Sequence, residues 1–205
     1  MGKDRQTSTA NSLSPGLSRA QRDIWFDQQR LADAATYNIG GYLSIAGRLD
    51  RQRFALAVTL LTQQNDALRL RLNLVEGVPR LIDAPLPLDQ ELLAFTDLSN
   101  QPDPQRLADQ LCQDALDRPF DLQGGPLFRA GLLKLSDSNY RWINVYHHLI
   151  CDGWGTGLVL GRLAAIYREL AARQVEKRSN PWDFLALKPA DTPQRPAPPP
   201  CPSFL

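Results

Sequence analysis

The sequence predicts a mixed α/β fold, a sandwich in which helices cover a sheet. Along the chain, helix-like segments, which have apolar residues at helical spacing, are interspersed with strand-like segments, in which apolar and polar residues alternate. The clearest strand signal lies at 68–74, where four leucines alternate with two arginines and an asparagine. Two further strand-like segments flank the polar turn 136–139. Helices and strands interspersed in this way are typical of an α/β sandwich.

Start signals support the individual helices. Ser18 and Gln21 can form a capping box, and Asp50 can cap the helix that follows it. The first helix has one polar residue, Gln28, on its apolar stripe, and Pro104 suits the first turn of the third helix. The expected helices are 19–31, 51–64, 104–117 and 156–172. The expected strands are 41–47, 68–74, 78–82, 92–97, 128–135 and 140–147.

One globular segment lies between two tails of different composition. Residues 1–16 are polar and end in Ser-Pro-Gly, so they are expected to form a disordered leader. Residues 176–205 contain eight of the sixteen prolines and are expected to form a linker, because proline fits neither a helix interior nor a central strand. The globular domain is therefore expected at 17–175.

Composition and charge exclude several classes of protein. The net charge is +1, from 23 basic and 22 acidic residues, without a local basic patch, so neither nucleic acid nor an anionic membrane is an expected partner. The three cysteines are far apart, which argues against a disulfide framework or a structural zinc site. No apolar run approaches the roughly 18 residues of a membrane span. A cytoplasmic protein is expected.

The two histidines of the chain are adjacent, at the end of an apolar strand. In extended chain, neighbouring side chains point to opposite faces, so His147 and His148 are poorly placed to hold one metal ion. A neutral imidazole is well suited to proton transfer near neutral pH. One histidine could then face a cleft while the other packs inside. Both could instead be structural, and composition alone favours that simpler interpretation.

The residues after the pair leave further alternatives open. Asp152 could orient a histidine or serve as a structural ion-pair partner. Gly153 and Gly155 would let a substrate approach the backbone closely. Cys151 has no flanking positive charge that would favour its thiolate, so it is a poor candidate nucleophile. A serine hydrolase is excluded because no G-x-S-x-G elbow occurs.

Four stretches in order together resemble the condensation-domain family of nonribosomal peptide synthetases. The family signature His-His-x-x-x-Asp-Gly matches YHHLICDGWG at 146–155. LSRAQRDIW at 17–25 and DRPFDLQGGPLF at 117–128 look like two further family segments. NDALR at 65–69 looks like the family's second motif, although Asn-Asp stands in place of His-Glu. The resemblance covers roughly 17–172.

The resemblance implies a fold and a reaction. The expected fold is a two-layer chloramphenicol-acetyltransferase-like sandwich lobe, the N-terminal half of a condensation domain without its C-terminal lobe. The implied reaction joins a carrier-bound acyl or aminoacyl thioester to an aminoacyl amine. Implied partners are donor and acceptor peptidyl carrier domains, with their phosphopantetheine arms, and an adenylation domain. No cofactor or metal is expected. The alternatives are an acyl-CoA-dependent acyltransferase of the same superfamily and a non-catalytic docking fragment.

The resemblance also assigns roles to residues. His148 would act on the acceptor amine as a base or positioning group, and His147 would be mainly structural. Asp152 would pair with Arg69 and so hold the loop, while Gly153 would line the channel. The isolated chain is expected to be inactive.

Overall fold

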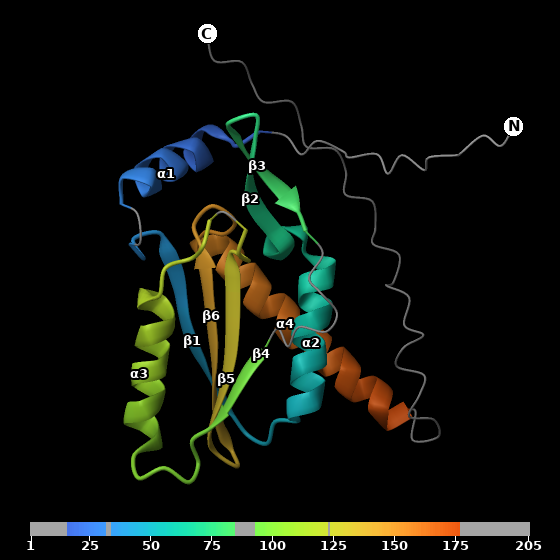
Figure 1. Ribbon diagram of the computed structural model, residues 1–205. Coiled ribbons are helices and arrows are strands. Elements are labelled where there is room, and N and C mark those ends of the chain that lie inside the picture. Colours follow the sequence, from blue (N-terminus) through green and yellow to red (C-terminus); the bar gives the residue numbers. More distant parts are fainter. Residues whose placement is uncertain (1–15, 32–33, 85–92, 123, 177–205) are drawn as a thin grey trace, which may run out of the picture.

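The computed structural model describes residues 16–31, 34–84, 93–122 and 124–176. The expected leader and proline-rich tail lie almost entirely outside these residues. A four-stranded sheet with the order β1-β6-β5-β4 forms the centre of the molecule (Figure 1). Its strands are β1 (Asn38–Ala46), β6 (Asn139–His147), β5 (Phe128–Ser136) and β4 (Leu93–Asp97). The sheet is mixed, because β6 pairs antiparallel with β1 and β5, whereas β4 pairs parallel with β5.

Helices cover both faces of this sheet. Figure 1 shows α3 (Pro104–Asp117) on one side and α2 (Arg51–Gln64) with α4 (Gly153–Glu176) on the other. The alternation of side chains along β6 supplies both faces: Trp142 packs with α2 and α4, whereas Ile143 and Val145 pack with α3. The mixed α/β class is therefore confirmed, but the lobe has three layers rather than the expected two.

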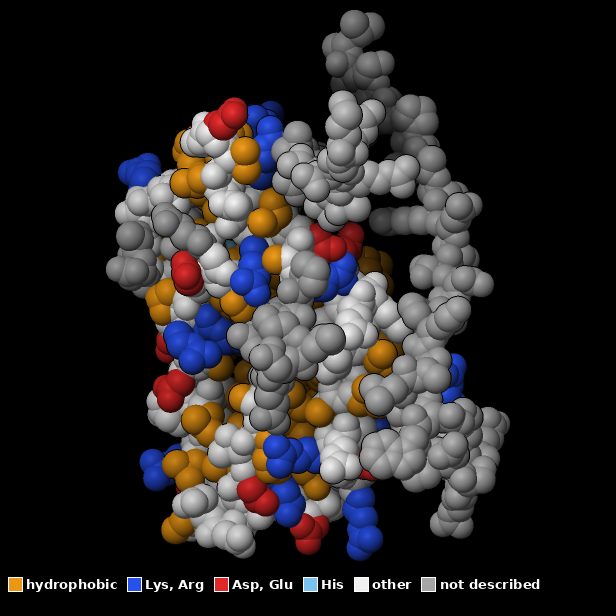
Figure 2. All heavy atoms as spheres, turned by 45° about the vertical axis from the view of Figure 1, so that its right-hand side comes forward, with side chains coloured by type: hydrophobic (Ala, Val, Ile, Leu, Met, Phe, Trp, Pro, Cys, Tyr) orange, Lys and Arg blue, Asp and Glu red, His pale blue; other side chains and the backbone are white. Residues whose placement is uncertain are grey.

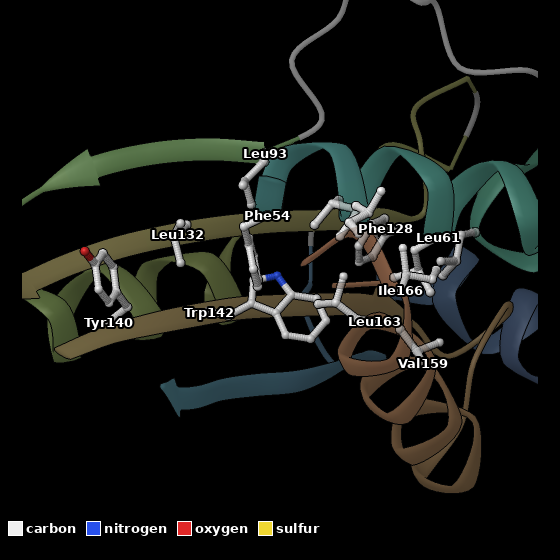
Figure 3. Close-up of a cluster of buried hydrophobic side chains, with 14 of the residues drawn as sticks. Phe54, Leu61, Leu93, Phe128, Leu132, Tyr140, Trp142, Val159, Leu163 and Ile166 are labelled. Carbon is white, nitrogen blue, oxygen red and sulfur yellow. The ribbon is translucent and has the colours of Figure 1, made fainter. Parts of the chain in front are cut away.

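The main core lies between the sheet and the α2–α4 pair (Figure 3). There the Phe54 ring of α2 meets the Trp142 ring of β6 edge to face, with centroids 6.0 Å apart. Leu163 of α4 lies beside them and is 3% exposed. On the surface drawn in Figure 2, charged side chains of both signs are interspersed with hydrophobic ones, in keeping with the balanced composition.

A smaller unit covers the end of the sheet at which β6 stops. It consists of α1 (Arg19–Arg30) and the antiparallel hairpin of β2 (Leu70–Val75) and β3 (Val78–Asp83) (Figure 1). The expected capping box is present: Ser18 accepts from the Gln21 N–H, and the Gln21 side chain accepts from the Ser18 N–H. Gln28, the polar residue on the apolar stripe, is buried, and its amide donates to two carbonyl oxygens just beyond the helix.

Most expected elements are confirmed, with three shifted starts. The strand expected from 68 begins at Leu70, because Asp66–Arg69 form a 3-10 turn. The strand expected from 41 begins at Asn38, and it passes Gly40, whose φ is +137°. The last helix begins at Gly153, three residues earlier than expected, so the glycines after the histidine pair lie in its first turn.

Candidate active site

The histidine pair lies where β6 ends, and a short turn leads from it into α4. Backbone hydrogen bonds fix this turn on both sides. The His147 N–H donates to the Leu127 carbonyl at 2.9 Å, and the His148 N–H donates to the Tyr37 carbonyl at 2.8 Å. The Ile150 N–H returns to the His147 carbonyl at 3.0 Å. The turn is therefore attached to two separate parts of the fold, just before β5 and just before β1, and is closed by one bond of its own.

The structure places His147 inside the lobe, with 2% of its surface exposed. Its ring lies between Tyr37 and Phe120, each with a centroid 6.1 Å away. Its Nδ1 accepts from the Leu149 N–H at 3.2 Å, which requires an unprotonated Nδ1. Burial, together with the neighbouring His148, lowers the pKa of His147 to about 4. His147 is therefore neutral at physiological pH.

His148 has the opposite environment. It is exposed, and it lies in the turn just past the last residue of β6. Within the described part of the chain, no hydrogen bond involves its imidazole. The ring is thus free to meet a substrate. The structure separates the two histidines into one buried and one accessible group.

Asp152 caps the N-terminus of α4. Its Oδ1 accepts from the Gly155 N–H at 2.7 Å, and its carbonyl accepts from the Thr156 N–H at 2.9 Å. A side chain at 155 would crowd this cap, because an added Cβ would lie 3.0 Å from the Cys151 sulfur. Gly153 is exposed and faces open space. Burial raises the pKa of the Cys151 thiol, which disfavours its thiolate.

The expected pair between Arg69 and Asp152 is wrong. Arg69 makes a bidentate contact with Asp83, with Nε and Nη2 at 2.9 and 2.7 Å from the two carboxylate oxygens. Its Nη1 donates to the carbonyls of Thr62 and Gln63 at the end of α2. The physical reason is that Arg69 lies in the 3-10 turn, next to Leu70, which pairs with Asp83 across the hairpin. Asp83 also raises the pKa of Arg69.

Sequence reasoning missed the support behind His147. Phe120, which touches His147 edge-on, is covered on another side by the Arg129 guanidinium, 3.8 Å from the ring centroid. Arg129 also donates to the carbonyls of Ala115, Arg118 and Pro119 at the end of α3. Burial lowers the pKa of Arg129 to about 10. The resemblance of 117–128 to a family segment was the signal that could have led to this cluster.

The site presents one accessible imidazole, that of His148. Among the residues that the structure describes, no group of three or more histidine, cysteine, aspartate or glutamate side chains could hold a metal ion. The same residues contain no helix long and apolar enough to cross a membrane. A single imidazole on a firmly held turn suits proton transfer to or from a bound substrate. Fold and site together define an α/β lobe that presents one accessible histidine at the end of β6.

Comparisons with known proteins identify the family. The condensation domain family matches residues 15–183. Chondramide synthase cmdD from Chondromyces crocatus is 32% identical over 170 residues, which are 80% of this chain and 4% of that protein. The dimodular nonribosomal peptide synthase of Bacillus subtilis is 30% identical over 183 residues, which are 89% of this chain and 8% of that protein. The chain therefore belongs to the condensation-domain family of nonribosomal peptide synthetases.

Solved structures agree with this result. The starter condensation domain of rhizomide synthetase RzmA superimposes with a TM-score of 0.72 at 32% identity, and a mutant of it is described in complex with C8-CoA. The first condensation domain of the calcium-dependent antibiotic synthetase, in complex with a substrate analogue, gives 0.73 at 30% identity. This chain aligns over 77% and 79% of its own length, but over only 38% and 39% of theirs.

Proposed function

We propose that this chain supplies the histidine-bearing lobe of a domain that forms amide bonds from carrier-bound thioesters. The observation that carries the proposal is the difference in exposure between the two histidines. His148 is exposed on a turn fixed by hydrogen bonds, whereas His147 is buried and neutral. One group is therefore available for chemistry while its neighbour holds the backbone.

The proposed reaction is an acyl transfer to nitrogen. The acceptor amine attacks the thioester carbonyl, and a C–N bond forms as the C–S bond breaks. His148 takes the proton from the attacking nitrogen, or orients that nitrogen, and the departing thiolate of the donor arm receives a proton. Asp152 contributes by capping α4, and Gly153 leaves open space beside the cap. Asp152 does not need to change its protonation state in this reaction.

The proposed substrates arrive on other domains. Phosphopantetheine arms of a donor and an acceptor carrier domain would present the thioester and the amine, and an adenylation domain would load them. The lobe itself, at 17–175, would bind no cofactor of its own and would work with a C-terminal lobe in the cytoplasm. The membership of the condensation family and the multidomain synthetases among the relatives support this assignment.

The test uses the full-length protein with two loaded carrier domains and follows amide formation by intact-protein mass spectrometry. His148→Ala is expected to slow product formation by about 10²–10⁴-fold, the usual range for general acid–base catalysis. The melting temperature should stay close to that of the wild type, because the imidazole is exposed. Wild-type turnover by this variant would remove the assignment.

A second candidate is an acyltransferase that uses acyl-CoA as donor. One observation favours this candidate: a mutant of the rhizomide synthetase starter condensation domain, which is 31% identical to this chain, has been solved in complex with C8-CoA. The same assay separates the two, with octanoyl-CoA and an octanoyl-loaded carrier domain offered in turn. Transfer from the carrier alone supports the first candidate, and equal transfer from free acyl-CoA supports the second.

A further inference from the structure

The Gln21 side chain connects α1 to the histidine turn. Its Nε2 donates to the Leu149 carbonyl at 2.9 Å, across 128 positions of the sequence. The same side chain closes the capping box, because its Oε1 accepts from the Ser18 N–H at 2.9 Å. One amide thus serves two elements at once.

The Gln21 carboxamide can make both of these bonds because it carries an acceptor and a donor. The Ser18 N–H is a donor and requires an acceptor, whereas the Leu149 carbonyl is an acceptor and requires a donor. The orientation of the Gln21 amide is fixed by these two partners. A glutamate at this position, the other usual capping-box residue, would satisfy Ser18 but not Leu149.

The bond reaches the peptide group between Leu149 and Ile150, one residue beyond His148. The Leu149 N–H donates to His147 Nδ1 at 3.2 Å, so Leu149 is tied at its nitrogen by the buried histidine and at its oxygen by Gln21. The Leu149 side chain is 2% exposed, and Ile24 and Trp25 of α1 pack against the cluster that contains it. The backbone that carries His148 therefore has little freedom to rotate.

We propose that Gln21 is a positioning residue for His148. It holds the Leu149 carbonyl and so aims the exposed imidazole at the reacting nitrogen. The role rests on the proposed function, because it matters for catalysis only if His148 acts on the amine. Small displacements of a positioned group are costly, since a shift of about 1 Å can reduce a rate by about 10²-fold.

The test compares Gln21→Glu with Ser18→Ala in the full-length protein. Gln21→Glu keeps the acceptor for the Ser18 N–H but replaces the donor to Leu149 by a carboxylate oxygen. Ser18→Ala removes only the bond from the Gln21 N–H to the Ser18 hydroxyl. We expect Gln21→Glu to lower kcat for amide formation by roughly 10- to 100-fold with little change in KM for the acceptor carrier. Ser18→Ala should keep the wild-type kcat.

A readout other than activity separates this proposal from the proposed function. The imidazole C–H signal of His148 can be assigned as the one that the spectrum of His148→Ala lacks. Gln21→Glu should shift or broaden the His148 signal, and Ser18→Ala should not. If the signal shifts while His148→Ala is fully active, the positioning is real and the proposed function has failed.

Two results would overturn the positioning role. One is an unchanged His148 signal and wild-type kcat in Gln21→Glu; the other is an equal loss of kcat in Ser18→Ala, which would reduce Gln21 to a helix cap. Gln21→Met guards against a charge artefact, because it removes the donor without placing a carboxylate beside the carbonyl. If Gln21→Glu does not fold, Gln21→Met is expected to show the same fall in kcat, and wild-type kcat in that variant would contradict the proposal.

Discussion

Acidification should weaken the fold through one residue, His147. Its ordinary pKa is near 6.5, and in the folded protein the pKa is lowered to about 4. As the pH falls below 6.5, the unfolded chain therefore takes up a proton before the folded one. Stability is fully present above pH 6.5 and is lost as the pH falls toward 4.

The size of the effect follows from the two pKa values. Proton uptake by the unfolded chain alone costs up to about 1.4 kcal/mol per pH unit. Between pH 7.5 and pH 4.5, the free energy of unfolding should fall by about 2.5 kcal/mol because of this group. This pH range isolates the effect of His147 from that of three carboxyl groups. Asp83, Asp97 and Asp137 have pKa values below their ordinary range, so they affect stability at lower pH.

Urea unfolding at pH 7.5 and 4.5 measures the loss. His147→Asn keeps an acceptor near the position of Nδ1 but does not titrate, so its stability should change much less between the two pH values. His148→Ala is the matched control: it removes the exposed histidine and should keep most of the wild-type loss, because burial is the larger cause of the lowered pKa of His147 and His148 the smaller one. Equal losses in the wild type and His147→Asn would refute the account of a buried neutral imidazole.

Two further substitutions test the supports of the site. Gly40→Ala should cost roughly 3–5 kcal/mol or prevent folding, because the residue has a φ of +137° and a Cβ there would overlap the carbonyl oxygen of Asn144; thermal unfolding within about 2 °C of the wild type would contradict this expectation. Arg129→Met should cost about 2–3 kcal/mol by leaving helix-end carbonyls without a charged donor. Arg106→Met, at an exposed position of α3, is its control and should leave the melting temperature unchanged, whereas equal effects of the two variants would show that Arg129 is an ordinary surface residue.

Local signals predicted the elements well. The capping box at Ser18 and Gln21 and the helix that begins at Pro104 were both expected from a few neighbouring residues. The burial of one histidine and the exposure of the other was one of the expected alternatives: β6 is buried on both faces as far as His147, and His148 is exposed just past the end of the strand. Such features depend on contacts within a few positions, which a sequence displays directly.

Local patterns failed to predict the structure where the same pattern fits two kinds of secondary structure. The alternating leucines continue back to Leu68, which is 2% exposed, yet Leu68 lies in a 3-10 turn. Burial on alternate positions therefore did not distinguish a strand from the turn before it. Gly153 and Gly155 resembled loop residues, but the Asp152 cap starts the helix before them.

Contacts between residues far apart in the sequence were the other feature that local patterns did not predict. The Arg69 partner could have been derived from the hairpin register, because pairing Val75 with Val78 places Leu70 opposite Asp83. The Gln21 bond had no such signal, since it depends on how α1 packs over the end of the sheet.

The measurement that tests the central claim most directly is a single-turnover rate of amide formation set beside the melting temperature, for His147→Asn and His148→Ala in the full-length protein. The buried and exposed positions predict opposite profiles. His148→Ala should lose about 10²–10⁴-fold in rate at an unchanged melting temperature. His147→Asn should have a lower melting temperature and retain more of the rate. A His148→Ala variant with the wild-type rate, beside a stable but inactive His147→Asn, would contradict the assignment of the two histidines.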